Sequence, residues 1–216
     1  ICSANGVAFF GRDSEATLPV WSAKKGYPGD PQYREFHKDL GWDLPLSELQ
    51  KVGIKTSRPL GLKLHKVSGY NKTLKEKDFY EPQLAKKKAK KHAKEYLIGR
   101  KIQLDLLRRN NKFEPLIVAP FDAELFGHWW FEGTLFIQEV FKQSEKEKVE
   151  LTTLKDYLIN KPMLQLCEPS PSSWGQGGFH KYWLNDTNSW VVSELSKASK
   201  EMILRCSNGV SNKTNL

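Results

Sequence analysis

Residues 120 to 133 read PFDAELFGHWWFEG, and they directly follow the short apolar run Leu116-Ile117-Val118-Ala119. An apolar run of this length is typical of a buried β-strand, so the quoted stretch is expected at the end of that strand. It places the carboxylates of Asp122 and Glu124 beside a histidine and two adjacent tryptophans. Such a group indicates either a poorly solvated turn or a site that holds a ring and transfers a proton.

Helical and strand-like segments alternate on both sides of this stretch. Helices are predicted from about Pro82 to Arg109, and over residues 128–143, 151–161 and 188–206. The first should end at the Asn110-Asn111 pair, and the third should begin at a Thr152 or Thr153 cap and stop at Pro162. Strands are predicted over residues 6–10, 115–120 and 163–169. This alternation predicts an α/β fold whose site lies at the carboxyl ends of strands.

Two further segments are predicted to be irregular but rich in aromatic residues. Residues 21–43 carry Gly26, Pro28, Gly29 and Pro31, which enforce a loop, and residues 57–81 contain polar turns. A second glycine-rich aromatic loop, residues 170–186, follows the last predicted strand. Loops with this many rings normally pack on a core or line a binding site.

The bulk composition indicates a globular protein. With 216 residues and 39% apolar residues, the chain can form one large domain or two small ones. It has no apolar stretch long enough to cross a bilayer, and its first ten residues do not resemble a secretory signal. We therefore expect no membrane association and a cytoplasmic protein. The cysteines, Cys2, Cys167 and Cys206, are far apart and are expected to be reduced.

The formal net charge of +9 raises nucleic acid as a partner. Much of the positive charge lies in residues 85–101, where Ala85, Ala89, Ala93 and Leu97 recur every four residues and lysines fill the other positions. This pattern favours an amphipathic helix with a solvated basic face, so nucleic acid is not the favoured partner. A phosphate-binding surface remains the alternative.

The residues themselves permit sugar chemistry. On an extended strand, Asp122 and Glu124 would point to one side, roughly 6.6 Å apart along the chain. Two close carboxylates can serve as acid and nucleophile in glycosidic cleavage, although Glu124 could equally cap the next helix or pair with a basic residue. Tryptophans gather around the two loops, at positions 129, 130, 174 and 183. Flat aromatic faces suit sugar rings, but either Trp129 or Trp130 could instead be a core residue.

The five histidines show no metal-binding spacing, so neither a metal nor a cofactor is indicated. His128 could bind a ligand oxygen or orient the acid, or it could be an ordinary turn histidine. The chain contains no nucleophile elbow, phosphate loop or dinucleotide-binding fingerprint.

Three blocks of this sequence resemble glycoside hydrolase family 57. FDAELFGHWWFEG (121–133) and SSWGQGGFHKYWLN (172–185) resemble the family's last two conserved regions, in the form found in its 1,4-α-glucan branching enzymes. GVAFFGRDSEATLPVWSAKKGYPGD (6–30) resembles a segment upstream of them. The resemblance extends from about Gly6 to Met202.

The resemblance implies a retaining, metal-free transglycosylase on an incomplete (β/α)7, TIM-like barrel. Such an enzyme cuts an α-1,4-glucan, holds it as a covalent glycosyl-enzyme and transfers it to a 6-hydroxyl group. Asp122 aligns with the general acid/base, and Trp174 with an aromatic residue that shapes the cleft. The remaining residues that fall in cleft-lining segments are His128, Trp129, Trp130, Arg12 and Trp21.

The sequence also departs from the family pattern. It lacks the early His-Gln-Pro-His type segment and the segment with the glutamate nucleophile, so we expect a middle-to-late piece with little or no activity alone. Residues 1–185 are expected to form part of the barrel, with a helical insertion at about 30–110, and residues 186–216 to begin a helical C-terminal domain. Alternatives are a 4-α-glucanotransferase or amylase of the same family, or a non-catalytic glucan-binding fragment.

Overall fold

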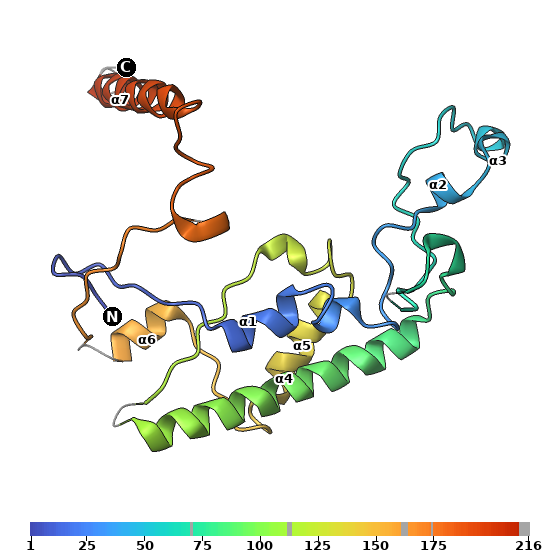
Figure 1. Ribbon diagram of the computed structural model, residues 1–216, viewed down its shortest axis with the longest axis horizontal. Helices are drawn as coiled ribbons and strands as arrows, with labels where there is room; N and C mark the ends of the chain where they lie inside the picture. The colour runs from blue at the N-terminus through green and yellow to red at the C-terminus, as the bar shows by residue number, and fades with distance from the viewer. Residues whose placement is uncertain (70, 112–113, 161–163, 174, 212–216) are drawn as a thin grey trace. The chain divides into compact units, whose positions relative to one another are not determined.

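A computed structural model describes residues 1–216 except 70, 112–113, 161–163, 174 and 212–216 (Figure 1). The chain divides into two compact units. The larger unit is Phe9–Leu164, and the smaller combines Ile1–Ala8 with Gln165–Leu216. Each unit is described by itself below.

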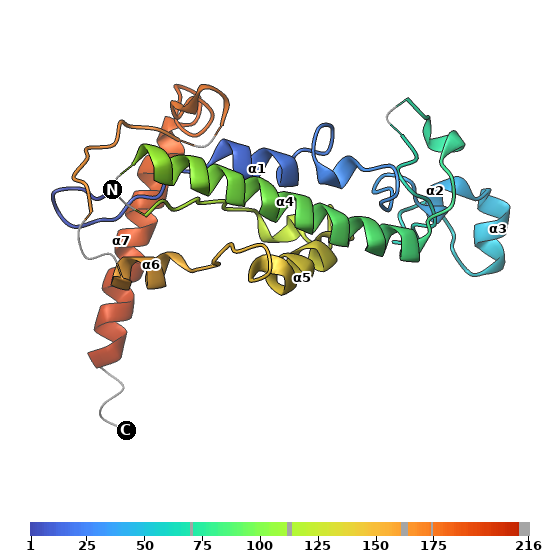
Figure 2. The ribbon, with the colours of Figure 1, turned by 90° about the horizontal axis from the view of Figure 1, so that it is seen from below.

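The larger unit is built around one long helix. Its helices are α1 (Ser14–Trp21), α2 (Leu40–Asp43), α3 (Leu46–Lys51), α4 (Pro82–Asn110), α5 (Gly133–Ser144) and α6 (Leu154–Asn160). Helix α5 packs against α4, as both views show, and α1 also contacts α4 (Figures 1 and 2). None of the described helices is both long and apolar enough to cross a bilayer.

Helix α4 confirms the helix predicted from the lysine-rich segment. Pro82 occupies its first turn, where the missing N–H costs nothing, and Asn111 follows as the C-cap. The side chains of Ala85, Ala89, Ala93 and Leu97 are fully buried along one stripe. Because small alanines let α5 approach closely, the apolar stripe fixes the helix against the core, and the lysines stay on the opposite face.

The core joins α4 to α5 and to the segments that precede them. Phe136 and Val140 of α5 are buried, as are Tyr33 and Trp130. The ring centroids of Trp130 lie 5.0 Å from Phe136 and 5.4 Å from Tyr33. Residues far apart in sequence therefore share one aromatic core, which fixes the segment 120–133 against α5.

The predicted strands do not pair into a sheet within the described residues. Residues 115–120 form no ladder, although the carbonyl of Val118 accepts a hydrogen bond from the Asp13 N–H at 2.8 Å. In the smaller unit, Cys2 makes isolated bridges to Ala8 and Leu166. A β-ladder needs a run of backbone hydrogen bonds to a second extended segment, and the bond between Asp13 and Val118 does not by itself make one. The described chain is mostly helical, so the barrel is not confirmed.

The other helices match the sequence predictions in type more than in bounds. Helix α5 begins at Gly133 instead of residue 128, because residues 127–130 form a turn in which the Gly127 N–H donates to the Trp130 carbonyl at 2.8 Å. Helix α6 begins after Thr153, whose hydroxyl accepts the Asp156 N–H at 3.1 Å, as predicted. The predicted stop at Pro162 lies outside the described residues. Helix α7 (Ser189–Ser211) of the smaller unit confirms the last helix, whereas the short α1, α2 and α3 were not predicted.

Residues 30–81, called the arm below, carry α2 and α3 and are held mainly by polar contacts. The carboxylate of Asp39 accepts the backbone N–H groups of Gly41, Leu60 and Gly61, each at 2.9 Å. Lys77 and Glu35 form a buried ion pair at 3.1 Å. The described part of the arm is therefore irregular, as predicted for residues 57–81, and its contacts join residues distant in sequence.

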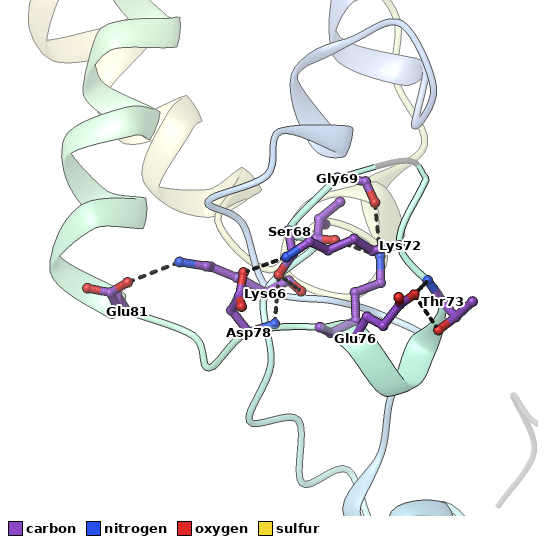
Figure 3. Close-up of polar contacts among 10 residues, drawn as sticks. Lys66, Ser68, Gly69, Lys72, Thr73, Glu76, Asp78 and Glu81 are labelled. Carbon is purple, nitrogen blue, oxygen red and sulfur yellow. Dashed lines mark hydrogen bonds and ion pairs between the residues drawn. The ribbon is translucent and has the colours of Figure 1, made fainter.

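The arm returns to α4 through the contacts drawn in Figure 3. Lys66 Nζ reaches the carboxylate of Glu81, the residue before α4, at 3.1 Å, and Lys72 pairs with Asp78 at 3.3 Å (Figure 3). The Ser68 hydroxyl accepts the Asp78 N–H at 2.8 Å. These bonds close the turn between residues 66 and 81, and so fix where the arm meets the first turn of α4.

Candidate functional site

The segment 122–132 folds onto itself through backbone hydrogen bonds. A 3₁₀ turn (Ala123–Leu125) starts it, and Asp122 precedes that turn. The carbonyl of Glu124 accepts the Trp129 N–H at 3.1 Å, and that of Leu125 accepts the Trp130 N–H at 2.8 Å. Asp122 and Trp129 therefore belong to one closed loop.

The two carboxylates of the loop are both exposed, but they do not lie on an extended strand. Because the backbone turns at Ala123–Leu125, the side-by-side arrangement expected for strand residues two apart does not apply to Asp122 and Glu124. The N-cap position of α5 is occupied by Glu132, so Glu124 does not cap that helix. Asp122 and Glu124 therefore do not form the carboxylate pair that an extended strand would give.

The adjacent tryptophans have opposite environments. Trp130 is only 2% exposed and fits the core alternative, whereas Trp129 is 53% exposed. The indole of Trp129 lies 4.6 Å from the ring of Phe36, centroid to centroid, at an interplanar angle of 34°. One side of Trp129 is therefore covered by the arm, and about half of its surface is open to solvent.

His128 joins the same cluster. Its ring lies 5.1 Å from Trp129 and 5.6 Å from Phe36, in edge-to-face arrangements. Phe36, His128 and Trp129 are called the aromatic wall below. Phe36 was missed by the sequence analysis because it lies in the arm, about 90 residues from the loop, and its neighbourhood carries no signal that pairs it with Trp129.

Glu132 is the second residue that the sequence analysis missed. It is fully buried, and its Oε1 accepts the Arg34 N–H at 3.1 Å, while the hydroxyl of Tyr80 interacts with the same carboxylate. Oε2 makes no hydrogen bond of standard geometry within the described residues. Burial raises the pKa of Glu132, and this outweighs the lowering by Tyr80 and Arg34. A carboxylate in this position holds the arm to the loop, but it is closed to substrate.

Two of the predicted site residues, Arg12 and Trp21, lie near opposite ends of α1. Arg12 is exposed and precedes Asp13, whose carboxylate caps α1 by accepting the Ala16 N–H at 2.6 Å. Trp21 is the last residue of α1 and is 51% exposed. An eight-residue helix is about 12 Å long, so Arg12 and Trp21 flank α1 instead of forming one cluster.

The second predicted loop belongs to the smaller unit. Trp174 lies outside the described residues. Trp183 is exposed, and its N–H donates to the His180 carbonyl at 2.8 Å within a tight turn. Among the described residues, no group of three or more histidine, cysteine or acidic side chains is arranged to hold a metal ion.

An open groove of about 1250 Å³ lies in the larger unit, between α4, α5 and residues 114–121. Phe121 and Phe126 are its only lining residues from the segment 121–133 in the described chain, and Asp122 and the aromatic wall are not part of it. Its lining is mostly apolar. The groove is therefore distinct from the site suggested by the exposed carboxylate and indole.

Comparisons with known proteins address the family. No protein-family model matches the chain. Over 92% of its length the chain is 35% identical to the 1,4-alpha-glucan branching enzyme of Thermococcus kodakarensis. A probable 1,4-alpha-glucan branching enzyme of Mycobacterium tuberculosis is 32% identical over 91% of the chain. The chain is similar to part of the family 57 branching enzymes. The resemblance seen in the three sequence blocks is thereby confirmed.

Solved structures agree with this relationship. An alpha-amylase from Thermotoga maritima matches all of the chain with a TM-score of 0.78 and 34% identity. A GH57-type branching enzyme from Pyrococcus horikoshii matches 87% of the chain with a TM-score of 0.72 and 33% identity. The chain spans 27% and 34% of the two curated relatives, and 40% and 32% of these two structures.

Proposed function

We propose that these residues form part of a 1,4-α-glucan branching enzyme of the family 57 type and supply its acid/base half. The observation that carries the proposal is the loop 122–132, which presents the exposed carboxylate of Asp122 and the exposed indole of Trp129. The similarity to enzymes named 1,4-alpha-glucan branching enzymes supports α-1,4-glucan as the substrate. The enzyme would be a transferase that makes α-1,6 branches.

In this proposal Asp122 protonates the leaving glycosidic oxygen and then accepts the proton of the incoming 6-hydroxyl group. A retaining site needs a second carboxylate about 5–5.5 Å away, on the other side of the anomeric carbon. Glu124 follows Asp122 on the same turn, so it does not meet this requirement. The nucleophile is assigned to a segment not found in this sequence.

The aromatic residues receive binding roles. Trp129 and His128 contact sugar rings, since indole faces stack on the C–H faces of glucose. Trp130 lies in the core and keeps a structural role there. Trp174, Arg12 and Trp21 are assigned glucan-binding roles because their segments resemble cleft-lining ones. No cofactor or metal is part of the proposed mechanism.

The proposal extends to the architecture. Residues 1–185 would contribute to an incomplete (β/α)7, TIM-like barrel that includes a helical insertion at about 30–110, and residues 186–216 would begin a helical domain. The family resemblance in both conserved blocks supports this arrangement. A cytoplasmic location without membrane contact accords with a glycogen-synthesising role, and nucleic acid is not a proposed partner.

A second candidate is an amylase or 4-α-glucanotransferase of the same family. The match of the whole chain to the alpha-amylase of Thermotoga maritima favours it. The product separates the candidates: branching lowers the iodine staining of amylose with little release of reducing ends, whereas an amylase raises reducing ends. A glucan-binding protein without catalysis would do neither.

The proposal is tested by electrophoresis of the 216-residue chain through gels with and without amylose, followed by incubation with amylose and NMR detection of α-1,6 anomeric protons. We expect retarded migration in amylose and no α-1,6 signal, for both the wild type and Asp122→Asn. Unretarded wild-type protein contradicts glucan binding. An α-1,6 signal lost in Asp122→Asn contradicts the assignment of the nucleophile to another segment.

A further inference from the structure

Residues 33–36 of the arm lie beside the loop 122–132. Tyr33 contacts Trp130 at 5.4 Å, and Phe36 contacts Trp129 at 4.6 Å, between ring centroids. Between these two ring contacts, the N–H of Arg34 donates to Glu132 Oε1. The exposed ring of Trp129 is therefore held by a segment that a buried carboxylate fixes to the loop.

The contact with Phe36 determines how Trp129 can meet a ligand. Because Phe36 covers one side of the indole at an angle of 34°, the other side is the one available for stacking. Phe36 is itself fixed from the arm: Lys63 donates to its backbone carbonyl, and the Lys63 ammonium lies 5.1 Å from its ring centroid. The ring is thus a rigid backing for Trp129.

Glu132 is suited to hold this arrangement and not to react. It is fully buried, whereas a catalytic carboxylate has to reach the glycosidic oxygen. Its hydrogen bond to the Arg34 N–H joins residues 98 positions apart. The guanidinium of Arg34 lies 3.5 Å above the ring of Phe131, which adds a second contact at the same point. Loss of the carboxylate would therefore loosen the arm at Arg34, two residues from Phe36.

We propose that Glu132 is a positioning residue for Trp129: through the Arg34 N–H it holds Phe36 behind the indole, so that Trp129 presents one fixed face to a glucan ring. This inference rests on the proposed function, since it names how that site binds its substrate. It adds Phe36 and Glu132 to the residues on which glucan affinity depends.

The test is a double-mutant cycle with Glu132→Ala and Phe36→Leu, read by maltoheptaose titration of the 216-residue chain. Each single variant should weaken affinity about fivefold, because loss of the backing frees the indole. The double variant should be no weaker than either single one, since both changes remove the same support. Additive losses would mean that Glu132 does not act through Phe36, and would overturn the proposal.

Two matched variants sharpen the cycle. Glu132→Gln keeps a carbonyl oxygen for the Arg34 N–H and should retain affinity within about twofold. Glu124→Gln removes an exposed carboxylate from the same loop and should leave affinity unchanged. Where Glu132→Ala fails to fold, Phe36→Leu decides alone, and full affinity in that variant overturns the proposal.

A readout without ligand separates this proposal from the proposed function. The indole N–H resonance of Trp129, assigned with Trp129→Phe, should shift in Glu132→Ala and remain in place in Glu132→Gln. If the wild type binds no maltoheptaose, the proposed function fails, and the glucan role of the positioning contact fails with it. If Trp129→Ala abolishes binding while folded Glu132→Ala and Phe36→Leu bind normally, only the positioning proposal fails.

Discussion

Adjacent residues of the loop have different tasks because their side chains leave the backbone in different directions. The sequence identified Trp129 and Trp130 as a pair, one of which could belong to the core, but it could not decide which. The structure assigns Trp130 to the core beside Tyr33 and leaves Trp129 exposed. The decision depends on contacts with the arm, about 90 residues earlier, and no local pattern encodes it.

The two tryptophans should therefore respond differently to truncation. Trp130→Ala removes a buried ring next to Phe136 and should lower the free energy of unfolding by about 3–5 kcal/mol. Trp129→Ala removes an exposed ring and should cost about 1 kcal/mol or less, the worth of its contact with Phe36. Urea unfolding of both variants measures the difference, and equal losses would contradict the burial assignment.

His92 should make stability depend on pH. It is buried on α4, its Nδ1 lies 2.8 Å from the Tyr33 hydroxyl, and Tyr27 stacks on its ring at 4.5 Å. Burial lowers the pKa of His92, and Lys88 adds to this, while Asp30 opposes it. The unfolded chain then binds more protons below about pH 6.5, so stability falls as the pH drops through the lowered pKa.

The measurement is urea unfolding of the wild type and His92→Gln between pH 8 and pH 5. The wild type should lose more stability than the variant across the range below about pH 6.5. His180→Gln, which changes an exposed histidine of the smaller unit, is the control and should follow the wild type. Parallel curves for the wild type and His92→Gln would show that His92 is not kept neutral by burial.

At the level of elements, helices were predictable and strand pairing was not. The period of Ala85, Ala89, Ala93 and Leu97 is local information, and α4 follows it closely. The start of α5 was misplaced because hydrophobic periodicity continues backward through Trp130, while Gly127 turns the chain. Residues 115–120 read as a strand, yet pairing requires a partner segment that local sequence does not specify.

Two helical glycines test the packing of α5 and α4. A Cβ on Gly133 would lie 2.9 Å from Phe126 Cδ1 and 3.0 Å from its Cα, whereas a Cβ on Gly99 would meet no atom within 4 Å. Gly133→Ala should therefore destabilise the protein by about 1–3 kcal/mol through overpacking. Gly99→Ala should stabilise it by about 0.5–1 kcal/mol, because alanine favours the helix.

Thermal unfolding compares the two glycine variants with the wild type in one experiment. The opposite signs are the prediction, because the same chemical change is made in two helices with different surroundings. A stabilising Gly133→Ala would contradict the close approach of Phe126 to the start of α5.

At the level of the whole molecule, the family resemblance was visible in three sequence blocks, but the arrangement of the site was not. The family resemblance of the segment 121–133 singled out Asp122, and the same segment marked Trp129 and Trp130 as a pair. Phe36 and Glu132 could not be chosen, because the contact of Phe36 with Trp129 and that of Glu132 with Arg34 depend on how the arm folds back onto the loop. The net positive charge did not identify a binding partner, because the exposed lysines of α4 lie on the helix face opposite its apolar stripe.

Saturation-transfer NMR with maltoheptaose tests the central claim, that the aromatic wall binds α-1,4-glucan, most directly. Irradiation of aromatic protein resonances should transfer saturation to the C–H protons of the glucose rings in the wild type, and the transfer should be largely lost in Trp129→Ala. Trp42→Ala, which removes an exposed indole of α2, should leave the transfer intact. Absence of transfer in the wild type, or full transfer in folded Trp129→Ala, would contradict the claim.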